Sequence, residues 1–171
     1  MKNKKIFMFL ILALIIIFVF SYQYLKLREE YNSLRSKAKY NFTYHLNASL
    51  SFANEIDINK INKGDKDSTI PLINMYEEIT NSYSTADIFF KYDFVLIDPT
   101  DMKIYQSTLK ETLSKITREK LTDEDVQKIN LVNEDIKSIY KYVNENKNIN
   151  IKKYASELRP NLKLVNTLEK K

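Results

Sequence analysis

The chain contains no cysteine and no tryptophan, and it has one glycine, one histidine and three prolines among its 171 residues. Without cysteine it has no disulfide framework, thiol nucleophile, haem attachment site or zinc cluster. A single glycine leaves no glycine-rich phosphate loop, and so few turn residues argue against a sandwich, a barrel or a Rossmann unit. The composition therefore favours a helical protein that needs neither a cofactor nor a metal ion.

Charge is nearly balanced along most of the chain. There are 27 basic and 22 acidic side chains, a formal net charge of +5, and Lys2, Lys4 and Lys5 supply three of the positive charges. The remainder is close to neutral, and its aromatic residues recur at the spacing of buried helix faces. A nucleic-acid interface needs a basic patch or a platform of stacking rings, so the sequence predicts no nucleic-acid partner.

A long apolar run follows the basic N-terminus. Residues 6–20 carry no charged or polar side chain, and the uncharged residues 21–25 bring the segment to 20 residues. A helix of about 20 residues crosses the hydrocarbon core of a bilayer. We predict a short cytoplasmic tail at 1–5 and an uncleaved, single-pass signal anchor in the cell membrane at 6–25. The alternative is a cleaved signal peptide, but residues 19–21 make a poor cleavage site because bulky side chains flank the small one.

Basic residues also follow the predicted span closely. They are Lys26, Arg28, Arg35, Lys37 and Lys39. The segments before and after the predicted span carry nearly the same number of positive charges. A short tail before a long domain is nevertheless typical of a signal anchor that exports its C-terminal part. We therefore expect residues 26–171 to be extracytoplasmic. The five basic residues are candidates for contact with anionic lipid headgroups; a solvated helix face offset by Glu29 and Glu30 is the equal alternative.

Apolar residues recur at helical spacing throughout residues 26–171. The expected helices cover 26–63 (a stalk that becomes the first helix), 70–92, 99–118, 123–146 and 150–168. Pro160 should kink or split the last of them. We predict an all-α fold in which the transmembrane helix continues into an antiparallel bundle of four long helices plus a shorter, Pro-broken C-terminal helix.

Local signals mark several helix ends. Asp98 before Pro99 is typical of an N-cap followed by proline in the first turn. Thr122 with Asp125 is a variant of the capping box. Gly64, the only glycine, indicates a turn after the first helix.

The stalk carries a heptad seam. Its positions are Leu27, Tyr31, Leu34, Ala38, Asn41, His45, Ala48 and Phe52, and a neighbouring stripe is formed by Phe42, Leu46, Leu50, Ala53 and Ile56. A heptad repeat is the pattern of coiled coils, so residues 27–52 offer a route to homodimerisation.

Few residues could carry chemistry. His45 is the only histidine and is interpreted as a packed side chain, since no further metal ligand stands at helical spacing from it. The acidic residues around Gly64 miss the calcium-loop pattern, in which the first, third and fifth positions are oxygen ligands. Asp98 with Asp101, and the acidic run 123–125, begin helices and are interpreted as caps. We predict no catalytic residues and no enzymatic activity.

Twelve tyrosines are the most unusual feature of the composition. Tyrosine is enriched at protein interfaces and among the residues that dominate binding energy. Tyr40 and Tyr44 lie one turn apart, away from Leu34 and Ala38, and are the candidates for contact with a partner.

The sequence thus predicts a membrane-anchored, non-catalytic helical interaction module. Its richness in Lys, Ile and Asn is typical of proteins from low-GC bacteria, and its partner would be an envelope protein that it assists, scaffolds or inhibits, the last including an immunity protein. The alternative is an extracytoplasmic sensor domain that binds a small ligand and signals through a partner.

Overall fold

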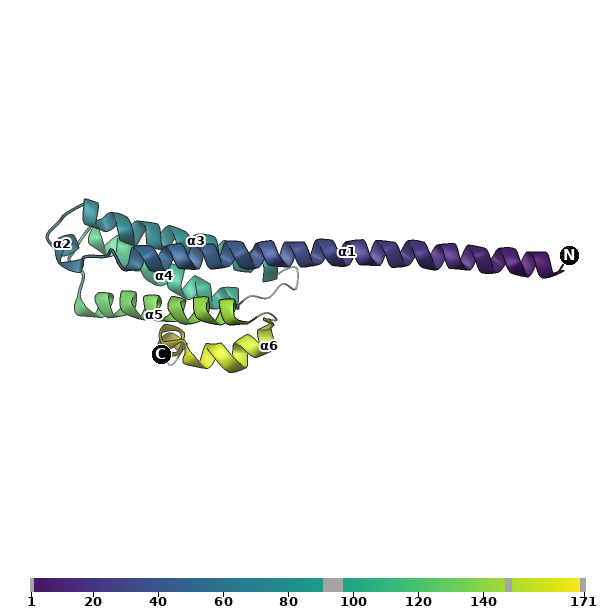
Figure 1. The fold of residues 1–171 in the computed structure, drawn as a ribbon. Helices are drawn as coiled ribbons and strands as arrows, with labels where there is room; N and C mark the ends of the chain where they lie inside the picture. The colour runs from purple at the N-terminus through teal and green to yellow at the C-terminus, as the bar shows by residue number, and fades with distance from the viewer. Residues whose placement is uncertain (1, 91–96, 147–148, 170–171) are drawn as a thin grey trace. The chain divides into compact units, whose positions relative to one another are not determined.

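The computed structural model describes residues 2–90, 97–146 and 149–169, and the all-α prediction is confirmed because the described residues form helices and connections without a strand (Figure 1). The chain divides into two units, residues 1–37 and 38–171. The first helix, α1 (Lys2–Ala53), contributes to both of them.

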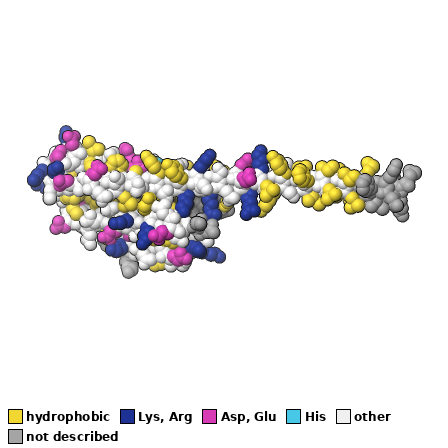
Figure 2. All heavy atoms as spheres, viewed as in Figure 1, with side chains coloured by type: hydrophobic (Ala, Val, Ile, Leu, Met, Phe, Trp, Pro, Cys, Tyr) yellow, Lys and Arg dark blue, Asp and Glu magenta, His cyan; other side chains and the backbone are white. Residues whose placement is uncertain are grey.

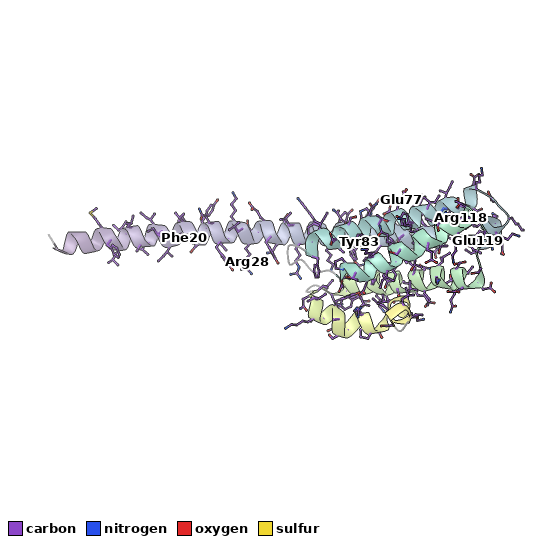
Figure 3. All side chains as sticks on the ribbon, turned by 180° about the vertical axis from the view of Figure 1, so that it is seen from behind. Phe20, Arg28, Glu77, Tyr83, Arg118 and Glu119 are labelled. Carbon is purple, nitrogen blue, oxygen red and sulfur yellow. The ribbon has the colours of Figure 1, made fainter. Side chains whose placement is uncertain are left out.

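The first unit is a helix with an exposed apolar surface. Within the described residues, α1 is the one helix long and apolar enough to cross a membrane, with a mean hydropathy of 2.4 over its most apolar window and none of that window buried. Phe20, for example, has 68% of its side chain exposed (Figure 3). Hydrophobic side chains cover this part of α1 in Figure 2. Such a surface is stable in lipid and unfavourable in water.

The second unit is a helical bundle. After α1 come α2 (Ile58–Asn62), the 3-10 turn η1 (Asp67–Thr69), α3 (Ile70–Phe90), α4 (Pro99–Ile116), α5 (Asp123–Glu145), α6 (Ile151–Lys153), the π-helical turn η2 (Tyr154–Leu158), the 3-10 turn η3 (Arg159–Asn161) and α7 (Lys163–Glu169). The four long helices are α1, α3, α4 and α5, and the C-terminal part is short and broken at Pro160, as predicted. Residues 91–92 of the expected second helix lie outside the described residues.

Side-chain pairs show that α4 and α5 run antiparallel. Lys115 near the end of α4 bonds Asp125 near the start of α5, while Tyr105 nearer the start of α4 bonds Asp135 farther along α5. The capping box of Thr122 and Asp125 is confirmed. It starts α5 only a few residues after α4 ends, so the two helices pack as neighbours.

The predicted first helix, 26–63, is wrong at its C-terminal end. α1 stops at Ala53, and Asp57, in extended conformation, starts the separate helix α2 by accepting a hydrogen bond from the Lys60 amide. This break lets Ile61 enter the core at 5% exposure. The turn after α2 is confirmed: Gly64 has φ +83, a conformation that glycine adopts without strain.

One core fills the bundle, and the long helices together with α2, η2 and α7 contribute to it. Its fully buried large side chains include Phe42 and Leu46 of α1, Leu72 and Ile79 of α3, Tyr105 and Leu109 of α4, Ile136 of α5 and Tyr154 of η2. On α3, Met75 and Ser82 are buried, whereas Tyr76 and Tyr83 lie beside the core with part of their surface exposed.

Candidate functional site

The bundle part of α1 has one buried and one exposed side. Ala38, Phe42, Leu46 and Ser49 are fully buried. The outward face is formed by Tyr40, Asn41, Tyr44, Asn47 and Ser51, all of them exposed. At 3.6 residues per turn these two sets lie on opposite sides of the helix. We call the exposed set the outward face of α1.

The buried side combines one member of the predicted seam with the neighbouring stripe. Ala38 of the seam is fully buried, but Asn41 is exposed and His45 and Ala48 are only partly buried. The neighbouring stripe, through Phe42 and Leu46, packs inward instead. The stripe carries larger apolar side chains than the seam does. The hydrophobic effect therefore favours a rotation of α1 about its axis that turns the stripe toward the core.

Tyr40 and Tyr44 are prominent on the outward face. Their exposed fractions are 69% and 58%, so the prediction that they lie off the core is confirmed, while a partner contact remains a prediction. Burial of a large, exposed aromatic side chain against a partner would remove its apolar surface from water, which favours binding.

Two further side chains hold Tyr44 in place. Its ring meets the ring of His45 edge to face, with centroids 5.4 Å apart and an interplanar angle of 77°. The His45 Nδ1 atom lies 2.6 Å from Oε2 of Glu78 on α3, and both side chains are about one quarter exposed. His45 is thus a packed, hydrogen-bonded side chain, as predicted. Sequence reasoning missed Glu78, because only the packing of α3 on α1 brings it there.

The outward face carries no charged side chain. Lys39, at its edge, directs its ammonium group across the bundle and donates a hydrogen bond of 2.9 Å to the carbonyl oxygen of Asn146. That carbonyl ends α5, where a positive charge is favourable for the helix dipole. Lys39 therefore has a structural role within the bundle.

The other candidate headgroup residues lie in the first unit. Lys26 and Arg28 follow the apolar run at once, whereas Arg35 and Lys37 come two to three turns later, about 15 Å farther along the helix at 1.5 Å per residue. Charges act on an anionic surface mainly within a Debye length of about 8 Å. If the helix stands upright in the bilayer, Lys26 and Arg28 are the residues best placed for headgroup contact.

Most acidic residues singled out in the sequence are caps. Asp98 accepts from the Thr100 amide, and Asp57 and Asp65 accept from backbone amides near the turn at Gly64. In the part of the chain that the structure describes, no three His, Asp or Glu side chains gather as a metal site.

Asp101 differs from the predicted cap. Its carboxylate is fully buried and accepts a hydrogen bond of 2.5 Å from the Tyr154 hydroxyl and one of 3.0 Å from Nε of Arg159. Burial and the nearby Asp101 carboxylate raise the pKa of Tyr154 well above its usual range. This cluster fastens the C-terminal segment to α4. The sequence gives no signal for it, since Asp101 lies more than 50 residues from Tyr154 and Arg159.

Asp135 of α5 makes a second buried connection to the C-terminal segment. Its carboxylate accepts from the backbone amides of Lys163 and Leu164 at 2.7 and 2.9 Å and from the Tyr105 hydroxyl at 3.2 Å. Asp135 thereby caps α7 from another helix. Burial raises the pKa of this carboxyl, although all three donors oppose the shift.

The surface of the bundle has grooves that are open to solvent. One of about 450 Å³ lies between α5 and α7 and is lined by Lys128, Leu131, Lys163 and Leu168 among others. Another of about 340 Å³, beside α4 and α7, is wide open to solvent. Asp101 and Asp135 use their polar groups within the bundle and do not line these grooves.

The chain matches no protein-family model, and neither a curated protein nor a solved structure shows similarity to it. The outward face of α1 is uncharged, it presents two exposed tyrosines, and it lies on a helix whose other side is buried in the core.

Proposed function

We propose that the chain is a membrane-anchored, non-catalytic interaction module that binds a protein through the outward face of α1. The observation that carries this proposal is the exposure of Tyr40 and Tyr44 on a helix that is firmly packed on its other side. Tyrosines of this kind supply large contact area at a low cost in side-chain entropy. A rigid helix adds little ordering cost when a partner binds.

The apolar part of α1 supports membrane attachment. Its length and hydropathy suit a span, and Lys26 and Arg28 would meet the headgroups at its end. We propose that the N-terminus is cytoplasmic and that the bundle lies outside the cytoplasmic membrane, in the cell envelope. The partner would then be an envelope protein that the chain assists, scaffolds or inhibits, as an immunity protein would. A ligand sensor is the weaker alternative, because a small-ligand site encloses most of its ligand, whereas the grooves described above are open to solvent.

Site-specific photo-crosslinking in cells tests the interaction. A photoreactive phenylalanine analogue would replace Tyr44 in the full-length chain, and a matched variant would carry it at the exposed Lys137 of α5. We expect an adduct from residue 44 that disappears when Tyr40→Arg is added. An adduct of equal yield from residue 137, or none from residue 44, would contradict the proposal.

Topology is tested with a single thiol. Because the chain has no cysteine, Ser107→Cys on the exposed side of α4 gives one reactive site. A membrane-impermeant maleimide should label it in intact cells. Labelling only after permeabilisation would place the bundle in the cytoplasm, and a shift in gel mobility would reveal cleavage of the N-terminal segment.

A further inference from the structure

The C-terminal part of the bundle has little regular helix of its own. It consists of α6 with three residues, the π-helical turn η2 with five, the 3-10 turn η3 with three and α7 with seven. Helices shorter than about 12 residues are marginal in water without tertiary contacts, and 3-10 turns have poorer hydrogen-bond geometry than α-helices. The order of residues 151–169, which we call the strap, therefore depends on the helices against which they pack.

The strap is attached to the long helices at two buried points. Near its start, Tyr154 bonds the carboxylate of Asp101 on α4, and near its end two backbone amides bond the carboxylate of Asp135 on α5. Between these points η2 and α7 pack along α5 (Figure 1). The two points are neighbours, because Tyr105 bonds Asp135 and is close enough to Tyr154 and Asp101 to feel their charge. We therefore expect both attachments to form and break together.

The attachment at Asp135 leaves a buried charge without an ion pair among the residues that the structure describes. Its hydrogen bonds come from two amides and a hydroxyl, and the ammonium group of Lys163 bonds Glu134 on the surface instead, at 2.7 Å. Burial raises the pKa of Asp135, so these uncharged donors do not fully replace the water that the carboxylate has lost. Detachment of the strap would hydrate the carboxylate again, which lowers the free-energy cost of opening.

Apolar contacts hold the strap closed in most molecules. Its buried side chains are Tyr154, Leu158, Leu162, Leu164 and Val165. Their burial removes apolar surface from water and favours the closed state. Opening is therefore a transient event in a bundle that is mainly closed.

The long helices keep their own contacts when the strap is absent from them. Gln106 of α4 bonds Thr80 of α3 at 3.1 Å, and Lys115 of α4 bonds Asp125 of α5 at 2.6 Å. Much of the core also belongs to these helices, as the fully buried Ile79 of α3 illustrates. Loss of the strap contacts thus leaves α1, α3, α4 and α5 joined to one another.

From these contacts we infer that the strap detaches from α4 and α5 as one unit while the four long helices stay folded. The bundle then has a closed state, described above, and a rarer open state in which Asp101 and Asp135 face water. Such partial opening in cooperative segments is a general property of small domains. The inference concerns a different part of the bundle from the outward face of α1 and does not depend on what binds there.

Hydrogen exchange of the full-length chain in detergent, followed by mass spectrometry, tests whether the strap opens alone. Under conditions where exchange reports the opening equilibrium, amides of η2 and α7 should have protection factors within about threefold of each other. Both should be at least about tenfold less protected than the buried part of α3 around Ile79. Much weaker protection of α7 than of η2 would show fraying from the chain end. Equal protection of the strap and α3 would show that the strap opens only with the whole bundle. Either result would overturn the inference.

Two conservative variants separate opening of the strap from unfolding of the bundle. Tyr154→Phe removes an attachment and should lower the protection of the strap at least about fivefold. Ile79→Val weakens a contact that persists when the strap is open, so it should lower the protection of α3 by about two- to tenfold and leave that of the strap unchanged. A loss of protection in the strap equal to that in α3 for Ile79→Val would contradict separate opening.

Thiol labelling gives a readout that does not depend on amides. Because the chain has no cysteine, Leu164→Cys places a single buried thiol on the strap, and Leu72→Cys places a matched buried thiol on α3. In the full-length chain in detergent, a maleimide should label Leu164→Cys at least about tenfold faster than Leu72→Cys. Circular dichroism shows whether each variant stays folded. Equal labelling rates in folded variants would overturn the inference, and if either variant unfolds, hydrogen exchange of the unaltered chain decides.

Discussion

The Tyr154 hydroxyl donates a hydrogen bond of 2.5 Å to Oδ2 of Asp101, and both side chains are completely excluded from solvent although 53 residues separate them. Arg159 supplies the positive charge that a buried carboxylate requires. Together with the cap that Asp135 provides for α7, this contact ties a short and irregular C-terminal segment to the long helices.

The buried hydroxyl of Tyr154 should matter for stability. Tyr154→Phe keeps the ring but leaves Asp101 with one donor fewer in a dry environment, so we expect the free energy of unfolding to fall by about 1–3 kcal/mol. The control is Tyr140→Phe on α5, where the side chain is partly exposed and the loss should be below about 0.5 kcal/mol. Urea unfolding of the full chain in detergent measures both. Equal losses for the two variants would show that the Asp101 contact contributes nothing.

Two carboxylates should titrate on opposite sides of the ordinary aspartate value of 3.8. Burial alone would raise the pKa of Asp125, but hydrogen bonds from Lys115 and Thr122 outweigh it and lower the pKa to about 2. For Asp135, burial prevails and the pKa is raised. Carbon-13 NMR titration of labelled aspartates in the full chain would measure both values, and titration of Asp125 above 3.8 would contradict the assignment.

The lowered pKa of Asp125 has a consequence for acid stability. A carboxyl group whose pKa is lower in the folded than in the unfolded state stabilises the fold above 3.8, and this contribution is lost as the pH falls toward 2. The full contribution is about 2 kcal/mol. Asp125→Asn should remove it, so the variant should be less stable than wild type at pH 6 and the gap should narrow by pH 2. A gap independent of pH would show that the Lys115 contact is not the cause.

The two sides of α1 should respond differently to truncation. Phe42→Ala empties a fully buried position and should lower the free energy of unfolding by about 3–5 kcal/mol. Tyr44→Ser changes an exposed residue and should cost less than about 1 kcal/mol, mainly through its contact with His45. Thermal unfolding followed by circular dichroism compares them. If Tyr44→Ser were as destabilising as Phe42→Ala, the outward face would have a structural role.

Basic residues near the membrane should differ in their effect on lipid preference. Lys26→Gln with Arg28→Gln should weaken the preference for phosphatidylglycerol over phosphatidylcholine by about 1 kcal/mol per charge. Arg35→Gln with Lys37→Gln should have a smaller effect, because screening weakens charges beyond a Debye length. Electron paramagnetic resonance of spin-labelled lipids in reconstituted bilayers measures the preference. Equal effects of the two double variants would contradict an upright helix.

The sequence by itself determined the features that depend on neighbours along the chain. The apolar run, the cap at Asp98 and the capping box of Thr122 and Asp125 are local patterns, and each occupies the place expected. The helical class also follows from local spacing. The end of α1 was missed because the helix pattern continues beyond Ala53, and only the core position of Ile61 requires the chain to turn there.

The tertiary structure alone decided which apolar stripe of α1 packs into the core. Residues 38–53 carry two stripes of similar spacing. Which of them is buried depends on how well its side chains fill the space beside α3 and α5. Burial of Phe42 and Leu46 leaves Tyr40 and Tyr44 outside. The buried hydrogen bonds of Asp101 and Asp135 also depend on the tertiary structure, because their partners are distant in sequence. Helix positions follow from local chemistry, whereas the outward face and the buried polar contacts depend on packing across the whole bundle.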